Sequence, residues 1–500
     1  MVDARNLGQL LRWWEWIKPD DVAVADERVT LTWQEFAART GGIADAMSAH
    51  GVRKGDRVAI LASNRVEWCE TLIAALRIGA VALPLNTRLA PSELRAIVSK
   101  AAPKLAFVES ATAKSLADAL AEVVPDHIVN FDSTAWVEFF EHGEFSEPEV
   151  DGEDTAILAF TSGTTGVAKG IELSHRAVIG VVDTHILSEP RFPVDHRQLQ
   201  LMPLYFFGGL VPSYLASLAV GGSVFLRSSF QPADALKTLV NERISCLTIV
   251  PTMMLEIAEL PEFADADLSS LVYGSTGATP VPPAVMRLWH RKGVVFRQGY
   301  GMTEAGLIAE QTADRAIEHP ERVGRPIGHT RVRIVNAENG ECPTGVPGEI
   351  LVKGPSLLTR YFGAETSPFE EGGWFRTGDI GVFHDDGTMS VIDRVKDLII
   401  SGGINVYPAE IEKVITELEG VIEVAVVGVP HPRWQEVPHA VVWATPDVTV
   451  DDILNTCRAN LAKYKVPHSV QFVNESLPRT ASGKVLKRLI AEEARHSVQQ

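Results

Sequence analysis

Apolar positions in the N-terminal part of the chain follow two alternating patterns, short unbroken runs and longer stretches with helical spacing. The short runs predict buried strands, and the longer stretches predict helices packed on those strands. Strands that alternate with helices are typical of a mostly parallel sheet, so the pattern predicts an α/β body with mixed and parallel sheets. The expected strands are 22–24, 29–32, 55–61 and 79–86, and the expected helices are 33–50 and 66–78.

Residues 1–20 carry apolar side chains at helical spacing. These side chains are Leu7, Leu10, Leu11, Trp14 and Ile17, and Trp13 and Trp16 add to them. The spacing predicts an amphipathic helix that packs on the body. A helix that lies on a membrane surface is the alternative, but the polar face lacks the usual excess of lysine and arginine.

The segment that follows Lys396 alternates in a similar way with shorter elements. At 500 residues the chain is too long for one small core, and about 100 residues suffice for a small α+β domain. We therefore expect a large N-terminal body of several subdomains over 1–395 and a small, mobile C-terminal α+β domain over 396–500. The short strands and helices expected in the latter are 408–419, 421–429, 450–462 and 469–473.

Two further segments have a clear local pattern. Residues 385–387 read Asp-Asp-Gly, which predicts a hairpin turn. Residues 138–154 contain eight acidic side chains with few apolar neighbours. This composition predicts a solvated linker rather than a site.

Composition narrows the possible functions mainly by exclusion. The formal net charge is −18 and the pI is about 5.3, which disfavours nucleic acid and anionic membranes as partners. No apolar run reaches the roughly 18 residues of a membrane span, and the N-terminus has no signal-peptide pattern. The four cysteines lack CxxC spacing and are typical of inert thiols in a reducing compartment, so we expect a cytoplasmic protein. The histidines include no H-E-x-x-H, so a catalytic zinc site is not expected.

Residues 161–170 read Thr-Ser-Gly-Thr-Thr-Gly-Val-Ala-Lys-Gly and follow a short apolar run at 156–160. Glycine leaves backbone N–H groups accessible, hydroxyls add donors and lysine adds a positive charge. A strand that leads into such a loop is where α/β proteins bind phosphates. The spacing differs from G-x-x-x-x-G-K-[ST], so this is not a Walker A loop. A surface turn rich in glycine and threonine is the alternative.

This run resembles the signature loop of the adenylate-forming superfamily, which includes acyl-CoA synthetases, coumarate-type ligases, luciferases and peptide-synthetase adenylation domains. In that family the loop holds the β- and γ-phosphates of ATP. The resemblance implies phosphate contacts from Thr161, Ser162, Gly163, Thr164, Thr165, Gly166 and Lys169.

A second motif of the family matches residues 298–304, Gln-Gly-Tyr-Gly-Met-Thr-Glu. The resemblance implies that Tyr300 stacks on adenine, that Thr303 contacts the α-phosphate and that Glu304 binds Mg²⁺ directly or through water. A carboxylate is the expected ligand for Mg²⁺ that is held mainly by phosphates and water. A strand and turn with one solvated glutamate is the alternative. The other nucleotide-binding residues implied here are Gly277, Ala278, Gln298, Gly299, Gly301 and Met302.

Two more motifs match at 373–379 and 393–410. The resemblance implies that Asp379 accepts hydrogen bonds from the ribose and that Arg394 reaches the same sugar. It places Lys396 at the hinge between the two domains, and it places Gly402 and Gly403 beside the pantetheine arm of CoA. Taken alone, these residues are also compatible with capped and tight turns. Ile404 stands where many members of the family have glutamate.

The fifth motif lies near the C-terminus, where residues 477–485 read Leu-Pro-Arg-Thr-Ala-Ser-Gly-Lys-Val. Its Lys484 matches the lysine that bridges the carboxylate and the α-phosphate during adenylation. A lone lysine here would be a solvated charge. All five motifs occur in the family's order, so we identify the chain as a member of the superfamily. Within it, the sequence most resembles bacterial acyl- and aryl-CoA ligases.

The resemblance also locates the pocket for the acid. Its lining is apolar and rich in glycine, and it offers no evident cation for a second carboxylate. Such a pocket suits an aromatic, alicyclic or medium-chain acid. Many members of the family have histidine at the position of Phe206, and each aromatic here is also compatible with ordinary core packing. The implied lining residues are Tyr205, Phe206, Phe207, Gly208, Gly274 and Gly306.

The expected function is an AMP-forming acid–thiol ligase that uses ATP, Mg²⁺ and CoA. It would convert a carboxylic acid to an acyl-adenylate and then, after rotation of the C-terminal domain, to an acyl-CoA. An amide synthetase with an amine acceptor and a luciferase-type oxygenase are the alternatives within the family. A peptide-synthetase module is disfavoured because no carrier domain follows Gln500, and a non-catalytic nucleotide-binding protein because Lys169, Glu304 and Lys484 are all present. We consider a homodimer as the assembly.

Overall fold

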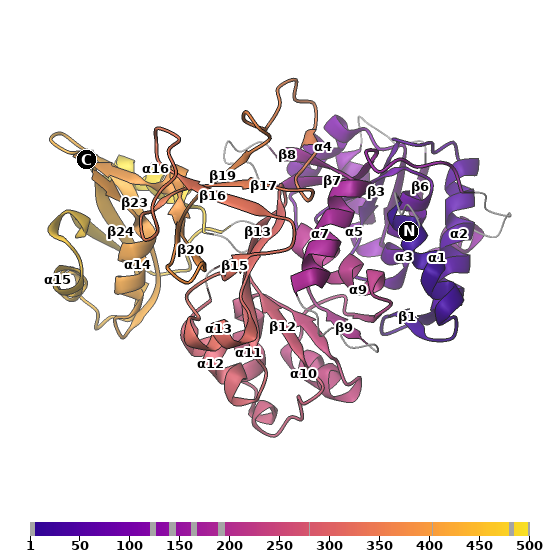
Figure 1. Ribbon diagram of the computed structural model, residues 1–500, viewed down its shortest axis with the longest axis horizontal. Coiled ribbons are helices and arrows are strands. Elements are labelled where there is room, and N and C mark those ends of the chain that lie inside the picture. Colours follow the sequence, from indigo (N-terminus) through magenta and orange to yellow (C-terminus); the bar gives the residue numbers. More distant parts are fainter. Residues whose placement is uncertain are drawn as a thin grey trace. The chain divides into compact units, whose positions relative to one another are not determined.

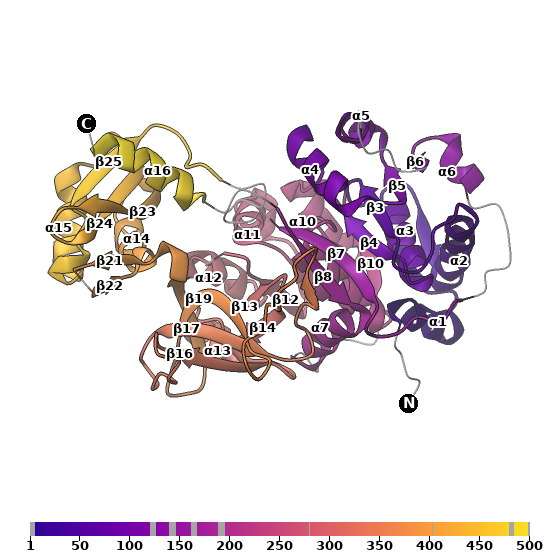
Figure 2. The same cartoon turned by 90° about the horizontal axis from the view of Figure 1, so that it is seen from above.

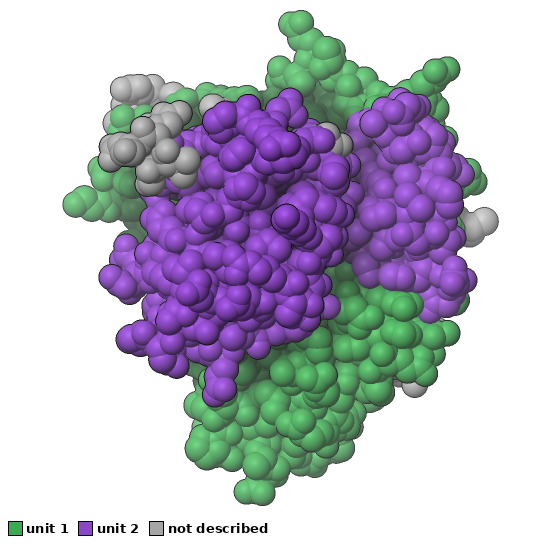
Figure 3. Space-filling view, turned by 90° about the vertical axis from the view of Figure 1, so that its left-hand side faces the viewer, with its two compact units in different colours: residues 1–332, 352–375 green, residues 333–351, 376–500 purple. Residues whose placement is uncertain are grey.

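The computed structural model describes residues 6–120, 127–139, 147–161, 168–188, 196–279, 281–402, 404–479 and 485–498 (Figure 1). Two compact units divide the chain. Unit 1 comprises Met1–Val332 and Val352–Phe375, and unit 2 comprises Arg333–Leu351 and Arg376–Gln500 (Figure 3). A four-stranded sheet thus groups with the C-terminal residues, and this division does not coincide with the boundary expected at 395/396. That boundary and the hinge at Lys396 stay predictions.

The first sheet of unit 1 has nine strands in the order β15-β14-β13-β12-β11-β9-β10-β1-β2. Neighbours from β13 to β1 are parallel, whereas the pairs at both edges are antiparallel. The expected strands at 22–24 and 29–32 are its β1 and β2. The strands are β1 (Val22–Ala25), β2 (Thr30–Thr32), β9 (Arg197–Gln200), β10 (Ser223–Leu226), β11 (Cys246–Thr248), β12 (Tyr273–Thr276), β13 (Phe296–Met302), β14 (Gly306–Glu310) and β15 (Arg325–Pro326).

The second sheet of unit 1 has seven strands in the order β18-β8-β7-β4-β3-β5-β6. Its centre from β7 to β6 is parallel, and β8 and β18 add an antiparallel edge. The strands expected at 55–61 and 79–86 are its β3 and β4, buried along most of their length. The strands are β3 (Arg57–Leu61), β4 (Val81–Pro84), β5 (Leu105–Val108), β6 (His127–Asn130), β7 (Thr155–Thr161), β8 (Lys169–Ser174) and β18 (Arg360–Tyr361).

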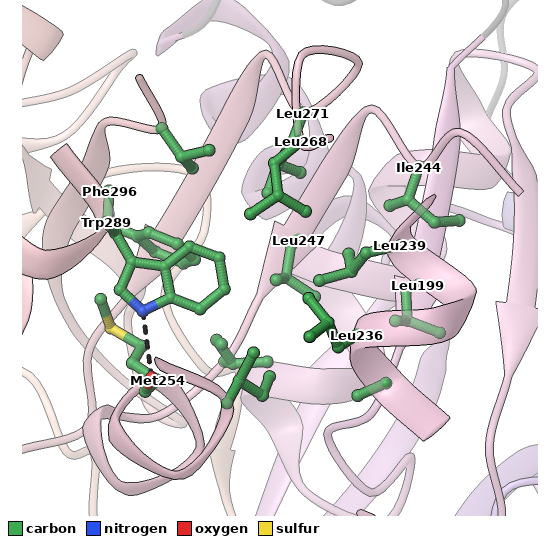
Figure 4. Close-up of a cluster of buried hydrophobic side chains, with 14 of the residues drawn as sticks. Leu199, Leu236, Leu239, Ile244, Leu247, Met254, Leu268, Leu271, Trp289 and Phe296 are labelled. Atoms are coloured by element: carbon green, nitrogen blue, oxygen red, sulfur yellow. Dashed lines mark hydrogen bonds between the residues drawn. The ribbon is translucent and has the colours of Figure 1, made fainter. Parts of the chain in front are cut away.

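Helices cover these sheets and bury their apolar residues. On one face of the first sheet Trp289 packs edge-on against Phe263 and Phe296 and donates its indole N–H to the Met254 carbonyl at 3.0 Å (Figure 4). The helices expected at 33–50 and 66–78 are α2 and α3. The helices of unit 1 are α1 (Leu7–Ile17), α2 (Trp33–Ala49), α3 (Val66–Arg77), α4 (Pro91–Ala101), α5 (Ser110–Ala119), α6 (Thr134–Phe139), α7 (His175–Ser188), α8 (Phe207–Gly209), α9 (Ala216–Ala219), α10 (Pro232–Asn241), α11 (Pro251–Ala258), α12 (Pro283–Arg291) and α13 (Ala313–Glu318), with a π-helix at Leu210–Leu215.

The N-terminal helix α1 packs on the body, but with a narrower face than the sequence predicted. Leu7 is buried, and the Trp14 indole donates to the Ala219 carbonyl at 3.2 Å. In contrast, Ile17, which we expected on the packed face, is 47% exposed. Trp13 and Trp16 are 53% and 74% exposed and contact each other. The expectation that these two side chains add to the packed face is therefore wrong, because a helix turns about 100° per residue and places both away from Trp14.

The acidic segment is also more ordered at its ends than a solvated linker. Glu138 lies in α6, and the carboxylate of Glu147 lies 3.1 Å from Nε of Arg77. Arg77, at the end of α3, is a largely buried cation, and a buried cation requires a counter-charge. Residues 140–146 lie outside the described residues.

Unit 2 begins with an antiparallel sheet in the order β16-β17-β19-β20. The hairpin turn expected at 385–387 joins its last two strands, with the Gly387 N–H donating to the His384 carbonyl at 2.9 Å. The strands are β16 (Arg331–Val335), β17 (Gly348–Lys353), β19 (Phe375–Phe383) and β20 (Met389–Arg394).

A second sheet of unit 2 follows a single turn at Val395–Asp397. Strands β23 and β24 form a long antiparallel hairpin, and β25 pairs parallel to β24. Helices α14 and α15 bury Ile411, Ile415, Ile453 and Cys457 on one face, and α16 buries Ile490 and Ala494 on the other (Figure 2). These elements are β21 (Ile399–Ser401), β22 (Ile404–Val406), α14 (Pro408–Thr416), β23 (Val421–His431), β24 (Gln435–Ala444), α15 (Val450–Asn460), β25 (Ser469–Val473) and α16 (Lys487–Val498).

Two features of the structure concern the expectations drawn from composition. Across the described residues, no helix combines the length and the apolar character needed to cross a bilayer. The four cysteines are free thiols; Cys69, Cys246 and Cys457 are buried, and Cys342 is partly exposed.

Candidate active site

The glycine- and threonine-rich loop joins two antiparallel strands at the edge of the parallel part of the second sheet. Strand β7 ends at Thr161, and the chain returns as β8, in which Lys169 is the cross-strand partner of Thr161. The ends of the loop therefore lie side by side at the carboxyl end of a parallel strand, where phosphate-binding loops are found. Ser162, Gly163, Thr164, Thr165 and Gly166 lie outside the described residues, and their phosphate contacts stay predictions.

The second motif forms a hairpin on the first sheet. Residues Gln298–Met302 belong to β13, and the chain turns back through Thr303 and Glu304 into β14, with the Ala305 N–H donating to the Met302 carbonyl at 3.1 Å. A side chain at Gly301 would clash with the Gly306 carbonyl, so close pairing of the two strands requires glycine. The tip from Tyr300 to Glu304 is partly exposed, so its side chains can reach a ligand.

The turn at 277–278 lies directly beside this hairpin. Strand β12 ends at Thr276, which is the cross-strand partner of Gln298. A Cβ atom at Gly277 would lie 2.7 Å from the Gly299 carbonyl oxygen, and Ala278 has φ of +68°. A non-glycine residue in the left-handed region costs free energy and is concentrated at functional sites. The structure thus brings together the nucleotide-binding candidates from β12 and β13.

Lys169 and Glu304 come from different sheets, and Tyr361 contacts both. The Tyr361 hydroxyl donates to Oε1 of Glu304 over 3.5 Å, and Nζ of Lys169 lies 5.5 Å from the centre of the Tyr361 ring. Burial, followed by the negative charge of Glu304, raises the pKa of Tyr361 to about 12. The sequence analysis missed Tyr361, because β18 is only two residues long and carries no recognisable pattern.

A buried polar cluster supports the hairpin. Glu310, the cross-strand partner of Gly299, accepts hydrogen bonds from the Tyr273 hydroxyl at 2.7 Å and the Ser275 hydroxyl at 3.1 Å. The Arg297 guanidinium lies 5.0 Å from the centre of the Tyr273 ring. Burial and the charge of Glu310 raise the pKa of Tyr273, whereas burial lowers the pKa of Arg297. This cluster fixes β12, β13 and β14 relative to one another, which a search for motifs could not reveal.

The residues expected around the acid are placed as follows. Tyr205, Phe206 and Phe207 are partly exposed rather than core side chains, and Gly208 is exposed at the start of α8. The side-chain position of Gly274 faces the Phe296 ring, and that of Gly306 faces Val181 of α7. The π-helix that follows α8 is a rare element that is frequent at functional sites. The assignment of these six residues to the acid stays a prediction.

In unit 2, Asp379 and Arg394 are cross-strand partners on β19 and β20. Nε of Arg394 donates to Oδ1 of Asp379 at 2.6 Å, and the aspartate is largely buried. Lys396 lies in the turn after β20, with Nζ 3.7 Å from Oδ1 of Asp397. The structure thus joins the two predicted ribose contacts, as a shared site would require.

Gly402 has φ of +59° and lies under the ring of Trp434. Its N–H donates to the Trp434 carbonyl at 2.7 Å, and a Cβ atom on Gly402 would lie 2.8 Å from the indole. The indole is partly exposed, and the Arg433 guanidinium lies 4.6 Å from the ring centre. Gly403 lies outside the described residues.

Lys484 also lies outside the described residues, but the segments on both sides of it are held firmly. On one side, the Glu423 carboxylate accepts from the Leu477 N–H and from the Arg479 guanidinium, both at 2.8 Å. On the other, Nζ of Lys487 lies 2.7 Å from Oε1 of Glu412. Burial alone would raise the pKa of Glu423, but the hydrogen bonds from Leu477 and Arg479 lower it.

The chain is similar to known proteins along most of its length. The family model described as AMP-binding enzyme matches residues 12–362, and the model of the C-terminal domain of these enzymes matches residues 410–484. A feruloyl-CoA synthase of an Amycolatopsis species is 37% identical over 478 residues, which cover 94% of this chain and 95% of that protein.

Two solved structures share the fold along nearly the whole chain. ATP-bound MatB from Rhodopseudomonas palustris has a TM-score of 0.89 at 30% identity and covers 98% of this chain and 99% of its own. The amide bond synthetase McbA from Marinactinospora thermotolerans has a TM-score of 0.88 at 29% identity, with coverage of 98% and 99%. Since the first family model alone covers more than half of the sequence, the chain belongs to the family of AMP-binding enzymes.

Proposed function

We propose that the chain is an AMP-forming carboxylate–CoA ligase. The observation that carries this proposal is that Tyr361 contacts both Lys169, at the end of the predicted phosphate loop, and Glu304, in the turn of the second motif: the ammonium lies over its ring, and the carboxylate accepts from its hydroxyl. A cation and a carboxylate in this arrangement suit a nucleoside triphosphate with its metal ion.

The chemistry follows from the poor reactivity of a carboxylate, whose leaving group would be oxide. In the first step a carboxylate oxygen attacks the α-phosphorus of ATP, the bond to the bridging oxygen of the β-phosphate breaks, and pyrophosphate leaves. In the second step the CoA sulfur, after loss of its proton, attacks the acyl carbon and AMP leaves. The protein contributes mainly by positioning the reactants and neutralising charge.

In the first step the residues of unit 1 bind the nucleotide. Lys169 and the loop that begins at Thr161 hold the β- and γ-phosphates, Thr303 contacts the α-phosphate and Tyr300 stacks on adenine. Glu304 would hold Mg²⁺, which would neutralise phosphate charge when bound. Among the described residues no group of three or more His, Cys, Asp or Glu side chains could hold a metal. A single carboxylate fits an ion that is coordinated mainly by phosphates and water.

Unit 2 supplies the remaining groups. Asp379 and Arg394 bind the ribose, and Lys484 bridges the acid and the α-phosphate in the first step. For the second step the C-terminal domain, residues 396–500, turns about a hinge near Lys396 relative to the body, residues 1–395. Gly402 and Gly403 then replace Lys484 and admit the pantetheine arm, because a glycine backbone leaves space for it.

The acid is aromatic, alicyclic or medium-chain. The partly exposed aromatic side chains Tyr205, Phe206 and Phe207 support this class, and so does the similarity to a feruloyl-CoA synthase. Buried free thiols support a reducing compartment and hence the cytoplasm as the place of action. A homodimer remains our proposal for the assembly.

An amide synthetase is the second candidate, because the structurally similar McbA is one. The deciding experiment incubates the chain with ATP, Mg²⁺ and a panel of acids of the three classes, with CoA, with amines or with neither acceptor. Pyrophosphate release and the product mass are measured. We expect acid-dependent pyrophosphate release and a thioester mass with CoA. An amide mass without a thioester would establish the second candidate, and absence of pyrophosphate with every acid would overturn the proposal.

A further inference from the structure

Tyr361 occupies a place where two sheets of unit 1 meet. It lies on β18 opposite Ile171 of β8, and β8 begins at Lys169, two residues earlier. Diagonal neighbours at this spacing share one face of an antiparallel pair and come within reach of aromatic and long side chains. The distance of 5.5 Å between the Lys169 ammonium and the Tyr361 ring centre is within the range of a cation–π contact.

The other end of the Tyr361 side chain faces the hairpin of the first sheet. Its hydroxyl is 3.5 Å from Oε1 of Glu304, a long hydrogen bond that does not by itself fix the geometry. The backbone fixes it instead, because the Leu358 N–H donates to the Glu304 carbonyl at 2.7 Å, three residues before Tyr361. The segment that carries Tyr361 is therefore joined to Glu304 through the backbone, and the contact between the two side chains bears only on the carboxylate.

We propose that Tyr361 is a positioning residue that sets the predicted metal-binding carboxylate of Glu304 and the predicted phosphate-binding ammonium of Lys169 relative to each other. The phenol suits this role because it has two distinct contact surfaces. Its ring face attracts a cation, whereas its hydroxyl donates to an anion and leaves the second carboxylate oxygen available. This inference rests on the proposed function, since it assigns partners to two of its residues.

The ring and the hydroxyl of Tyr361 can be tested separately with two substitutions. Tyr361→Phe keeps the ring and removes the donor, so it should weaken only the contribution of Mg²⁺. Tyr361→Leu removes both surfaces, so it should also weaken binding of metal-free ATP. The matched control is Tyr464→Leu in unit 2, which removes a similar contact with the Lys465 ammonium, 5.8 Å from the ring centre, and involves none of the residues assigned to the nucleotide.

The test is calorimetric titration of the full chain with ATP in the absence of acid, at several Mg²⁺ concentrations and with EDTA. For Tyr361→Phe we expect a ~3–10-fold rise in the Mg²⁺ concentration needed for half-maximal ATP affinity, the scale of one ordinary net hydrogen bond, because this bond is long, with unchanged affinity in EDTA. For Tyr361→Leu we expect a further ~2–5-fold loss of affinity in EDTA. Tyr464→Leu should match the unsubstituted chain in both conditions.

A thermal unfolding scan of each variant checks that it is folded, so that a loss of affinity is not caused by unfolding. Equal losses with and without Mg²⁺ in Tyr361→Phe would overturn the inference and make Tyr361 a packing residue. An additive effect of Tyr361→Phe and Glu304→Gln on the Mg²⁺ dependence would also overturn it, because two groups that act through one contact are not additive. Failure of the proposed function is distinguishable, since the unsubstituted chain would then bind no ATP at all.

Discussion

Units 1 and 2 both carry motifs of the family, but they hold them in different kinds of structure. In unit 1 the motif residues lie on hairpins at the edges of two parallel sheets, where Thr161 pairs with Lys169 and Gly299 with Glu310. In unit 2 one pair, Asp379 and Arg394, is fixed across two strands, whereas Gly402 lies in a short turn. Under the proposed function, unit 1 supplies the charges that hold the nucleotide, whereas unit 2 combines ribose contacts with Lys484, Gly402 and Gly403, which serve one step each.

The largest expected effect comes from Lys484→Ala in unit 2. Adenylation should fall by ~10²–10⁴, the scale of losing a partner for charge that develops in the transition state. Thioester formation from supplied acyl-adenylate and CoA should survive. Pyrophosphate release and thioester formation are assayed separately. Parallel loss in both assays would contradict the assignment of Lys484 to the first step alone.

Gly403→Leu should have the opposite effect on the two half-reactions. A side chain at this position would obstruct the pantetheine arm, and misplacement by about 1 Å costs roughly 10²-fold in rate. Thioester formation should therefore fall by about 10²-fold while pyrophosphate release continues. Product mass spectrometry beside a pyrophosphate assay measures both. Normal thioester turnover would place the route of CoA elsewhere.

Lowering the pH should reduce the stability of unit 1 through two buried histidines. Burial lowers the pKa of His175 to about 4 and that of His196 to about 3, from an ordinary value of 6.5. Above pH 6.5 both histidines are neutral in the folded and unfolded chain. As the pH falls, the unfolded chain binds protons first, so stability falls until the pH approaches the folded values. Each should favour unfolding by about tenfold per pH unit well below 6.5 and above its folded pKa, so the two together give about a hundredfold.

Calorimetric unfolding at pH 7.5, 6.0 and 5.0 checks this effect. His196→Asn should be less stable at pH 7.5, but it should lose less stability on acidification than the unsubstituted chain. An equal loss in both proteins would exclude His196 as a source of the pH dependence.

Glu423→Gln in unit 2 should have the smallest effect. It removes the charge that binds Leu477 and Arg479 beside the segment of Lys484. We expect a ~3–10-fold loss of adenylation, the scale of one ordinary net hydrogen bond, because Gln still offers an acceptor, with little change in thioester formation from acyl-adenylate. Glu492→Gln, which removes an exposed ion pair with Arg488 on α16, is the matched control. A similar loss in the control would mean that any weakening of the C-terminal helix suffices.

Local pattern predicted the elements that depend on neighbouring residues. The alternation of apolar runs and helical spacing gave α2, α3, β3 and β4, and Asp-Asp-Gly gave the turn between β19 and β20. It could not give the sheet orders, because β1 pairs with β10 from a distant part of the chain. It also overestimated the buried face of α1, since the direction of Trp13 and Trp16 is set by the helical turn rather than by their hydrophobicity.

The same limit applies to the candidate site. Motifs supplied Lys169 and Glu304 one at a time, and Asp379 and Arg394 likewise. Their meeting depends on strand pairing and on contacts between sheets, which no motif encodes. Tyr361 and Glu310 were missed for this reason, since each acts through its spatial neighbours rather than through its neighbours in sequence.

The distribution of thiols makes the chain suitable for site-selective labelling. Cys69, Cys246 and Cys457 are buried, so a maleimide dye should react chiefly with Cys342. Cys342 lies in the part of unit 2 that precedes Val352. A second cysteine introduced by Lys413→Cys, at an exposed position beyond the proposed hinge, would create a dye pair without removal of any native cysteine. Energy transfer between the two dyes would be measured first with ATP and acid and again after CoA is added. A change between these two conditions would report the rotation directly in solution.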